Sequence, residues 1–192
     1  MSPAPTLTDA REGAPVVILR AHRPDDAQGS YEQCQDPLSQ EWTTVPLPYT
    51  REMAHGFVTE MMPGGWSDDS EWGFALDVDG RYAGTVSLRN EGDGRAEIAY
   101  GSHPWVRGTG AVERALRLLL DWGFAERDLR TVVWWANTGN WASRKVAWRL
   151  GFTMEGTVRQ YLPHRGELRD AWVATLLAGD PREPRTAWDG PS

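Results

Sequence analysis

Hydrophobic positions recur along this chain with two different periods, which together predict a sheet packed against helices. Short apolar or alternating runs, typical of strands, occupy residues 16–20, 72–78, 82–90, 96–100, 131–136, 153–161 and 168–177. Helical spacing or capping residues predict helices over 24–36, from Thr50 to about Met62, after Gly110, and from Asn140 to Gly151. We expect loops at 37–50 and 64–73. Strands that lead into a β-α-β-α-β-β order therefore predict an α/β fold with a sheet of mixed direction.

The helix that follows Gly110 has the clearest pattern. Its apolar positions recur at helical spacing and leave the opposite side charged: Ala111, Ala115, Leu118, Leu119 and Trp122. The strand at 131–136 is apolar on both faces, which is typical of a central strand covered on both sides. The Asp79–Gly80 pair supplies the positive φ that a tight hairpin turn requires. The pattern therefore predicts a hairpin over 72–90 and a buried central strand.

Length and composition indicate one domain with loose ends. With 192 residues, 40% of them hydrophobic, the chain can bury one well-packed core and is short for two. The polar, proline-bearing ends predict a flexible N-terminus over 1–12 and a flexible tail over 179–192, around a single domain at 13–178. The first ten residues lack the basic start and apolar core of a secretory signal, and Cys34 is the single cysteine. We therefore expect a cytoplasmic protein.

Charge and hydropathy exclude several classes of partner. The formal net charge is −7, whereas a nucleic-acid footprint needs clustered Lys and Arg, so we expect no nucleic-acid partner. No apolar run approaches the roughly 20 residues that span a bilayer, so we expect no membrane partner. No cluster of His, Cys and Asp has metal-ligand spacing, so we expect no metal. The oligomeric state stays open, a homodimer included.

The segment from Ala96 to Val112 carries the most chemistry. An alternating run ends at Gly101, a proline corner follows, and Gly108 and Gly110 precede the start of a helix. Amides in such a loop and in the first helical turn lack internal partners, and the helix dipole adds partial positive charge there. Glycines let a phosphate approach these amides closely. The segment therefore predicts a site for a phosphorylated small-molecule cofactor.

A second motif, NWASRKVAWRLGF at 140–152, begins one strand later. With it, the chain resembles the GNAT superfamily of acyl-CoA-dependent N-acyltransferases, specifically its RimJ/RimL-like branch. The other matching pieces are EWTTVPLPYT at 41–50, EIAY with HPWVRGTGAVERAL at 97–116, and RGELRDAWV at 165–173. They cover the body of the chain from about 16 to 177 in family order and spacing. The resemblance implies a single-domain, mostly antiparallel twisted sheet flanked by helices, with splayed central strands.

The resemblance also implies where acetyl-CoA, the co-substrate, binds. In the family the loop amides hold the coenzyme A pyrophosphate, a role that falls here on Arg107, Gly108, Thr109, Gly110 and Ala111. The end of the family's fourth strand pairs with the pantetheine arm, and the matching residues are Tyr100, Gly101 and Ser102. Asn140 corresponds to an asparagine that contacts the same arm, although it also fits the role of a simple helix cap.

Several positions depart from the family pattern. Val112 stands where the family usually has Gly or Ala, and its branched side chain could crowd the cofactor, although its amide is kept. Gly101 and Ser102 replace larger apolar residues, which should enlarge or loosen the acceptor side of the site. Ala147 stands where many members carry a tyrosine general acid, seven residues after Asn140.

Two residues are candidates for catalysis. Glu97 lies on the strand that lines the thioester and is the candidate general base, acting through water; a solvent-facing strand carboxylate is the alternative. Ser143 matches a serine often present in this branch and could donate a hydrogen bond or a proton to the departing thiolate. The alternative is that Ser143 is a small residue that lets the helix pack closely against a strand.

We therefore expect an N-acetyltransferase in which a neutral amine attacks acetyl-CoA directly within a ternary complex. Amides near residues 100–102 would polarise the carbonyl group. The acceptor is a protein N-terminal α-amine or a small-molecule amine. The alternative is an acyl-CoA-binding regulatory or scaffold protein with little catalytic activity, because Ala147, Val112 and the open question of the base leave the chemistry incomplete.

Overall fold

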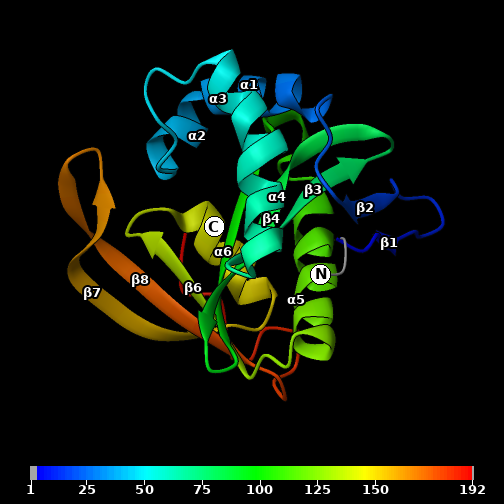
Figure 1. Cartoon of the computed structure of the whole chain (residues 1–192). Coiled ribbons are helices and arrows are strands. Elements are labelled where there is room, and N and C mark those ends of the chain that lie inside the picture. The colour runs from blue at the N-terminus through cyan, green and yellow to red at the C-terminus, as the bar shows by residue number, and fades with distance from the viewer. Residues whose placement is uncertain (1–3, 192) are drawn as a thin grey trace.

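The computed structural model describes residues 4–191, which form an eight-stranded sheet flanked by helices (Figure 1). The strands are β1 Leu7–Asp9, β2 Val17–Arg20, β3 Glu71–Val78, β4 Arg81–Gly92, β5 Arg95–Ser102, β6 Thr131–Asn137, β7 Thr153–His164 and β8 Glu167–Leu177. They lie in the spatial order β1-β2-β3-β4-β5-β6-β8-β7. Neighbours in this sheet pair antiparallel except β5 and β6, which are parallel. The predicted α/β fold with a mostly antiparallel sheet is confirmed.

The helices of the described chain follow the predicted positions in most places. They are α1 Asp26–Gln35, α2 Pro37–Trp42, α3 Arg51–Gly56, α4 Met62–Asp68, α5 Ala111–Glu126 and α6 Trp141–Arg149. A π-helical turn, η1 Phe57–Met61, joins α3 to α4, and a 3-10 turn, η2 Pro104–Val106, follows β5. The helices predicted at 24–36, after Gly110 and after Asn140 are confirmed.

The loop predicted over residues 37–50 was wrong in part, because α2 occupies its first half. Asp36 caps this helix by accepting a hydrogen bond from the Ser39 amide at 2.9 Å. Pro37 occupies the first helical turn, where its missing N–H group has no helical partner to lose. The prediction failed because a proline that breaks a helix interior favours a helix start.

The next helix runs past its predicted end at residue 62, so the loop predicted at 64–73 was also wrong. α3, η1 and α4 continue to Asp68. Pro63 has no N–H group and would crowd the carbonyl four residues earlier, which the wider π-helical turn before it relieves. Gly65 serves packing here, because a Cβ at this position would lie 2.7 Å from a backbone carbonyl of β3.

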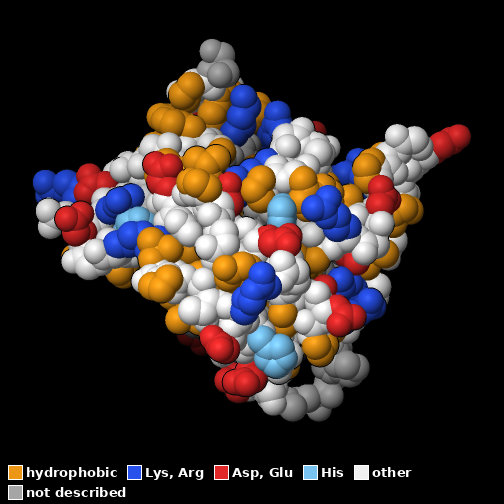
Figure 2. All heavy atoms as spheres, turned by 90° about the horizontal axis from the view of Figure 1, so that it is seen from above, with side chains coloured by type: hydrophobic (Ala, Val, Ile, Leu, Met, Phe, Trp, Pro, Cys, Tyr) orange, Lys and Arg blue, Asp and Glu red, His pale blue; other side chains and the backbone are white. Residues whose placement is uncertain are grey.

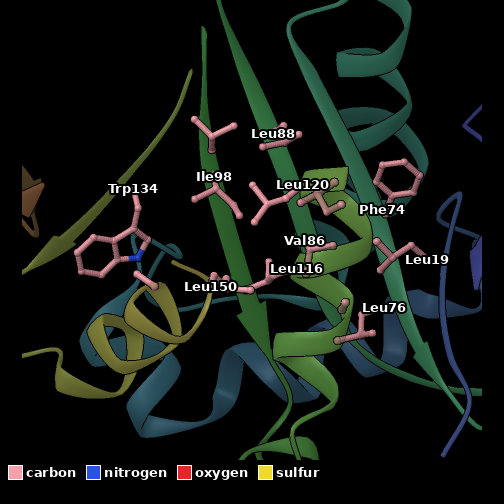
Figure 3. Close-up of a cluster of buried hydrophobic side chains, with 14 of the residues drawn as sticks. Leu19, Phe74, Leu76, Val86, Leu88, Ile98, Leu116, Leu120, Trp134 and Leu150 are labelled. Atoms are coloured by element: carbon pink, nitrogen blue, oxygen red, sulfur yellow. The ribbon is translucent and has the colours of Figure 1, made fainter. Parts of the chain in front are cut away.

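One face of the sheet packs against α5 and α6 to form the main core (Figure 3). The largest fully buried side chains include Leu19, Phe74, Leu76 and Leu88 from the sheet, Leu116, Leu119 and Leu120 from α5, Leu150 after α6, and Trp134 of β6. Leu118, which the pattern placed inward, is only partly buried. The helical stripe of α5 is therefore wider than predicted and includes Leu116 and Leu120.

Helices α1 and α4 lie against the opposite face of the sheet, where small residues set how closely they approach. Gly29 of α1 faces the Tyr82 ring of β4, and Gly73 of β3 faces Met62 at the start of α4. A Cβ on either glycine would clash with that side chain. The sheet is therefore enclosed by helices on both faces, and the α1 face and the α6 face are named below by these helices.

The central strands β5 and β6 pair over only three residues each, Arg95–Glu97 with Thr131–Val133. Beyond Glu97, β5 continues beside β4 to Ser102, whereas β6 continues beside β8 to Asn137. Figure 1 shows β6, β8 and β7 leaving the rest of the sheet. The two strands therefore diverge and leave a gap between them, which confirms the predicted splay.

Both ends of the chain make contacts that the composition did not indicate. Residues 7–9, within the segment expected to be flexible, form β1 and pair with β2. Trp148 and Arg144 of α6 donate hydrogen bonds to residues 186–189 of the tail, at 2.9 and 2.6 Å. The Trp188 ring of the tail also packs against the rings of Trp141 and Trp148 of α6. A short backbone ladder, two side-chain hydrogen bonds and one aromatic residue have no periodicity, so no pattern reveals these contacts. Residues 1–3 and 192 of the two predicted flexible ends lie outside the described residues.

A buried ion cluster joins α1 to β2 and β3. Arg20 donates to both carboxylate oxygens of Asp26 at 2.8 Å and to Asp77 Oδ2 at 3.1 Å. The three side chains are at most 10% exposed. Burial alone would raise the pKa of Asp26, but the hydrogen bonds from Arg20 and from a backbone amide outweigh burial and lower it. The buried negative charges of Asp26 and Asp77 are therefore compensated only while Arg20 is present.

Arg20→Met is expected to lower the free energy of unfolding by about 3–5 kcal/mol near neutral pH, because it leaves two buried carboxylates unpaired. Urea denaturation measures this loss. A carboxylate with a lowered pKa contributes stability above its unfolded-state pKa and loses it as pH falls through the folded-state pKa, so the loss should shrink in acid. Arg11→Met, which removes an exposed partner of Asp9, should cost less than about 1 kcal/mol. Equal losses in both variants would contradict this role.

Candidate active site

Backbone amides of β5 that do not pair with β4 point into the gap between β5 and β6. The His103 amide donates to the Ala83 carbonyl at 2.8 Å, across the Ser102–Gly84 pair. Ser102–Gly84 is therefore a non-hydrogen-bonded pair of the antiparallel ladder, and Tyr100, two residues earlier, has the same orientation. The amides of Tyr100 and Ser102 consequently point away from β4 and into the gap. By the same alternation, the intervening amide pairs with β4.

The glycine loop after η2 presents further free amides at the start of α5. Gly108 and Gly110 have φ values of 77° and 83°, and a Cβ on either would have no neighbour within 4 Å. The amides of Gly108, Gly110 and Val112 donate to no group in residues 4–191. Those of Arg107 and Thr109 are already used within the turn, at 3.2 and 3.4 Å. The loop is therefore an open cradle of amides that fits a phosphate.

The Arg107 side chain fastens this loop to its surroundings. Its Nη2 donates to Asp36 Oδ2 at 2.7 Å, and to Ser39 Oγ and the Ser102 carbonyl at 3.0 Å. Burial alone would raise the pKa of Asp36, but the bonds from Arg107 and the Ser39 amide lower it. The guanidinium is therefore matched by a carboxylate, and it ties the loop to the end of β5 and the start of α2.

Helix α6 begins on the other side of the gap. The Asn140 Oδ1 accepts a hydrogen bond from the Ser143 amide at 3.1 Å, so the predicted cap is confirmed. The Ser143 Oγ lies 2.7 Å from the Tyr100 Oη of β5 and 3.1 Å from the Trp134 Nε1 of β6. The hydroxyl of Ser143 therefore joins both diverging strands to α6.

Glu97 lies at the apex of the gap, where β5 and β6 stop pairing. Its side chain is 29% exposed and lies 3.1 Å from Arg89 Nη1. Burial raises the pKa of Glu97, and the nearby Arg89 only partly offsets this effect. Ile98 and Tyr100 contact the core on the α6 face, so Glu97 points to the α1 face. The candidate base and Ser143 therefore lie on opposite faces of the sheet, Glu97 on the α1 face and Ser143 on the α6 face.

Gln33 of α1 is a neighbour of the site that the sequence pattern missed. Its side chain is 8% exposed, and its Nε2 would lie 2.7 Å from a Cβ on Gly101. The expectation that Gly101 enlarges the acceptor side was therefore wrong at this point, because Gln33 fills the space. The Gln33 Oε1 has no hydrogen-bond partner in residues 4–191. Helix α1 is only weakly amphipathic, so its pattern could not single this residue out.

Two of the residues that depart from the family pattern, Val112 and Ala147, pack their side chains inside the protein. Val112 is partly buried against the core cluster, which accounts for its side chain without involving the loop. Ala147 is 1% exposed in the same core. No acidic hydroxyl therefore stands at position 147.

Two further classes of site are missing from residues 4–191. No three His, Cys, Asp or Glu side chains gather closely enough there to hold a metal ion. None of the helices in this range combines the length and the apolar character needed to cross a membrane.

Comparison with known families shows which family of proteins has this gap and this loop. The family model described as an acetyltransferase (GNAT) domain matches residues 17–153, which include the gap, the glycine loop and α6. The chain belongs to the GNAT acetyltransferase family. The resemblance drawn from the glycine loop and the motif at 140–152 is thereby confirmed.

Curated relatives of this GNAT protein carry the names of N-acetyltransferases. A putative ribosomal N-acetyltransferase, YdaF of Bacillus subtilis, is 33% identical over 114 residues, which cover 58% of either chain. Spermidine N(1)-acetyltransferase of Escherichia coli K12 is 31% identical over 106 residues, 54% of this chain and 57% of that one. This chain thus spans a little over half the length of the curated relatives it matches. One relative is named for the ribosome and the other for a polyamine.

Solved structures reproduce the fold over nearly the whole chain. A crystal structure of a probable acetyltransferase has a TM-score of 0.78 at 27% identity, covering 89% of this chain and 97% of that one. Mycobacterium smegmatis RimJ in complex with CoA-disulfide has a TM-score of 0.80 at 23% identity, covering 93% and 90%. The GNAT protein therefore shares the fold of a RimJ/RimL-like acetyltransferase, and its open amide cradle fits the phosphates of coenzyme A.

Proposed function

We propose that this GNAT protein is an acetyl-CoA-dependent N-acetyltransferase that acts on a primary amine. The observation that carries the proposal is the gap itself, onto which free amides of β5 open and which has Glu97 on the α1 face of the sheet and Ser143 on the α6 face. The free amides of the glycine loop suit the pyrophosphate, and those of Tyr100 and Ser102 suit the pantetheine arm and the thioester. The remaining residues proposed to line the cofactor site are Gly101, Arg107, Thr109, Ala111, Val112 and Asn140.

The proposed reaction assigns one task to each face of the sheet. The neutral amine attacks the thioester carbonyl, and the Glu97 carboxylate takes the proton that the amine loses, directly or through water. Amides of β5 donate to the negative charge that develops on the carbonyl oxygen. The C–S bond then breaks, its electron pair leaves with sulfur, and the Ser143 hydroxyl donates to that sulfur. Glu97 would act from the α1 face of the sheet and Ser143 from the α6 face.

A protein N-terminal α-amine is the acceptor we propose. Figure 2 shows the end of the molecule at α1, α2 and α3 with basic and acidic side chains interspersed, without a continuous acidic surface to attract a polyamine. An α-amine also needs less help from a base, since its pKa lies near 8. We further propose a cytoplasmic location, where the free and buried Cys34 stays reduced.

A panel of acceptors tests this proposal. Thiol release from acetyl-CoA would be followed with short peptides that carry a free α-amine, with the same peptides N-terminally blocked, and with spermidine and lysine. Release with the free peptides alone supports the proposed acceptor, and release with spermidine alone assigns a small amine instead. Tight acetyl-CoA binding without release in any arm would favour the acyl-CoA-binding regulatory or scaffold protein.

Gln33→Ala is expected to raise the KM for the amine acceptor about 5-fold to 10-fold, because a buried acceptor oxygen beside the site is lost. The KM for acetyl-CoA should stay within about 2-fold, since Gln33 lies on the α1 face. Steady-state kinetics with each substrate varied in turn measures both constants. A change confined to the acetyl-CoA constant would remove Gln33 from the acceptor side. Gln28→Ala, on the exposed side of the same helix, is the control.

A further inference from the structure

The Ser143 hydroxyl lies within hydrogen-bond distance of polar side chains from two different strands. The Trp134 Nε1 of β6 lies 3.1 Å from Ser143 Oγ, and an indole N–H can only donate. The Tyr100 Oη of β5 lies 2.7 Å from the same Oγ and 3.2 Å from the Ser143 carbonyl. The Ser143 carbonyl can only accept, whereas either hydroxyl can donate across the 2.7 Å contact between Tyr100 and Ser143.

The direction of the Tyr100 contact decides what Ser143 can do. A serine hydroxyl has one proton and two acceptor lone pairs. When Tyr100 donates as Trp134 does, both lone pairs are taken, and the Oγ–H must point to a third partner. Tyr100 and Ser143 both keep part of their surface exposed, and both lie beside the gap between the diverging strands.

We propose that Tyr100 donates to Ser143 Oγ as Trp134 does, and that these two positioning residues commit the Ser143 hydroxyl to donating toward the sulfur of coenzyme A. The inference rests on the proposed function, because it requires coenzyme A in the gap. Ser143 lies one helical turn before Ala147 on the same side of α6, which is the surface that a long side chain at 147 would cover. The pair from β5 and α6 thus reaches the region that a tyrosine on α6 would reach.

The step itself needs no net proton transfer from this pair. When the C–S bond breaks, its electron pair stays on sulfur, and the proton of the amine has gone to Glu97. Ser143 stabilises the thiolate by a charge-assisted hydrogen bond and keeps its proton. Burial raises the pKa of Tyr100, so the phenol also keeps its proton and remains a donor. The thiolate leaves as the anion and is protonated in solvent.

A titration of bound coenzyme A tests the inference without catalytic turnover. The pKa of its thiol would be titrated on the protein by the ultraviolet absorbance of the thiolate. In Ser143→Ala this pKa should lie about one unit higher than in the unaltered protein, because a hydrogen bond to the anion is lost. Tyr100→Phe should raise it by part of that amount. The double variant should match Ser143→Ala, because Tyr100 acts only through Oγ.

Tyr82→Phe is the matched control, since the Tyr82 hydroxyl is bonded to Thr85 on the α1 face. It should leave the thiol pKa unchanged. Steady-state kinetics adds a second measurement: Tyr100→Phe should lower kcat about 5-fold at constant KM for acetyl-CoA, and should cause no further loss in the Ser143→Ala background.

Additive effects of Tyr100→Phe and Ser143→Ala, or an equal thiol pKa in every variant, would overturn the inference. A non-additive thiol shift in a protein that acetylates no amine would support the inference and reject the proposed function. Failure of coenzyme A to bind at all would overturn both.

Discussion

Gly108→Val and Gly110→Val are each expected to weaken acetyl-CoA binding by about 100-fold or more, which isothermal titration calorimetry measures directly. Both glycines have positive φ, 77° and 83°, a backbone region that a β-branched residue avoids. The new side chain would also project into open space at the amide cradle, where a phosphate must approach. The loss of binding follows from both effects together.

Gly92→Val separates the loss of the cradle from general backbone strain. Gly92 has a φ of 74°, and a Cβ added to it, as to the two loop glycines, would have no neighbour within 4 Å. It is the last residue of β4 and pairs with Arg95 at the start of β5, at the other end of β5 from the loop. The three variants should therefore lose similar stability, but Gly92→Val should keep its affinity for acetyl-CoA. Equal affinity in all of them would remove the loop from the cofactor site.

Glu97→Gln is expected to lower kcat by about 100-fold or more, because it removes the proposed general base and keeps the shape of the side chain. The effect should depend on the acceptor. At pH 7 a lysine-like amine with a pKa near 10.4 costs about 4.6 kcal/mol to deprotonate, whereas an α-amine near 8 costs about 1.4 kcal/mol. The loss should therefore be larger for lysine-like amines than for peptide α-amines. Steady-state kinetics with both acceptors measures it.

The pH dependence of kcat/KM gives the same test another readout. The amine must be neutral to attack, so its own deprotonation gives kcat/KM one acid limb, near a pKa of about 8 for an α-amine. Burial raises the pKa of Glu97, and only its ionised form accepts a proton, so a second acid limb should begin where pH falls through that raised pKa. This second limb should lie above the range of an ordinary carboxyl and should vanish in Glu97→Gln, which keeps the limb of the amine. Glu71→Gln, which removes a carboxylate 3.5 Å from the same Arg89, should keep both limbs and most of kcat. A second limb that survives Glu97→Gln would assign the base to another group.

Periodicity and turn chemistry were sufficient for most of the fold. The Asp79–Gly80 turn, the helical stripe after Gly110 and the cap at Asn140 are local signals, and each produced the expected element. The prediction failed where residues that are common in loops lie in helices. Pro37 starts α2, and the α3–α4 helix continues through Pro63 and the two glycines that follow it.

The candidate site could also be predicted only in part. Its glycines and its cap lie within two continuous motifs, so sequence spacing could place them. Gln33 against Gly101, and Tyr100 against Ser143, are contacts between elements far apart in the chain. They depend on how α1 and α6 pack against opposite faces of β5, which no local pattern contains. The side chain of Arg107 is similar, because its partners Asp36 and Ser102 come from two other elements.

The coupled appearance of free thiol and acetylated amine tests the central claim most directly. Acetyl-CoA and a peptide with a free α-amine would be incubated with the protein, with Glu97→Gln and with Gly92→Val, and both products would be quantified by thiol assay and mass spectrometry. The proposed chemistry predicts one acetylated peptide for each thiol released, at least about 100-fold more slowly in Glu97→Gln and at a near-normal rate in Gly92→Val. Thiol release without an acetylated amine, or no release with any amine despite tight acetyl-CoA binding, would contradict it.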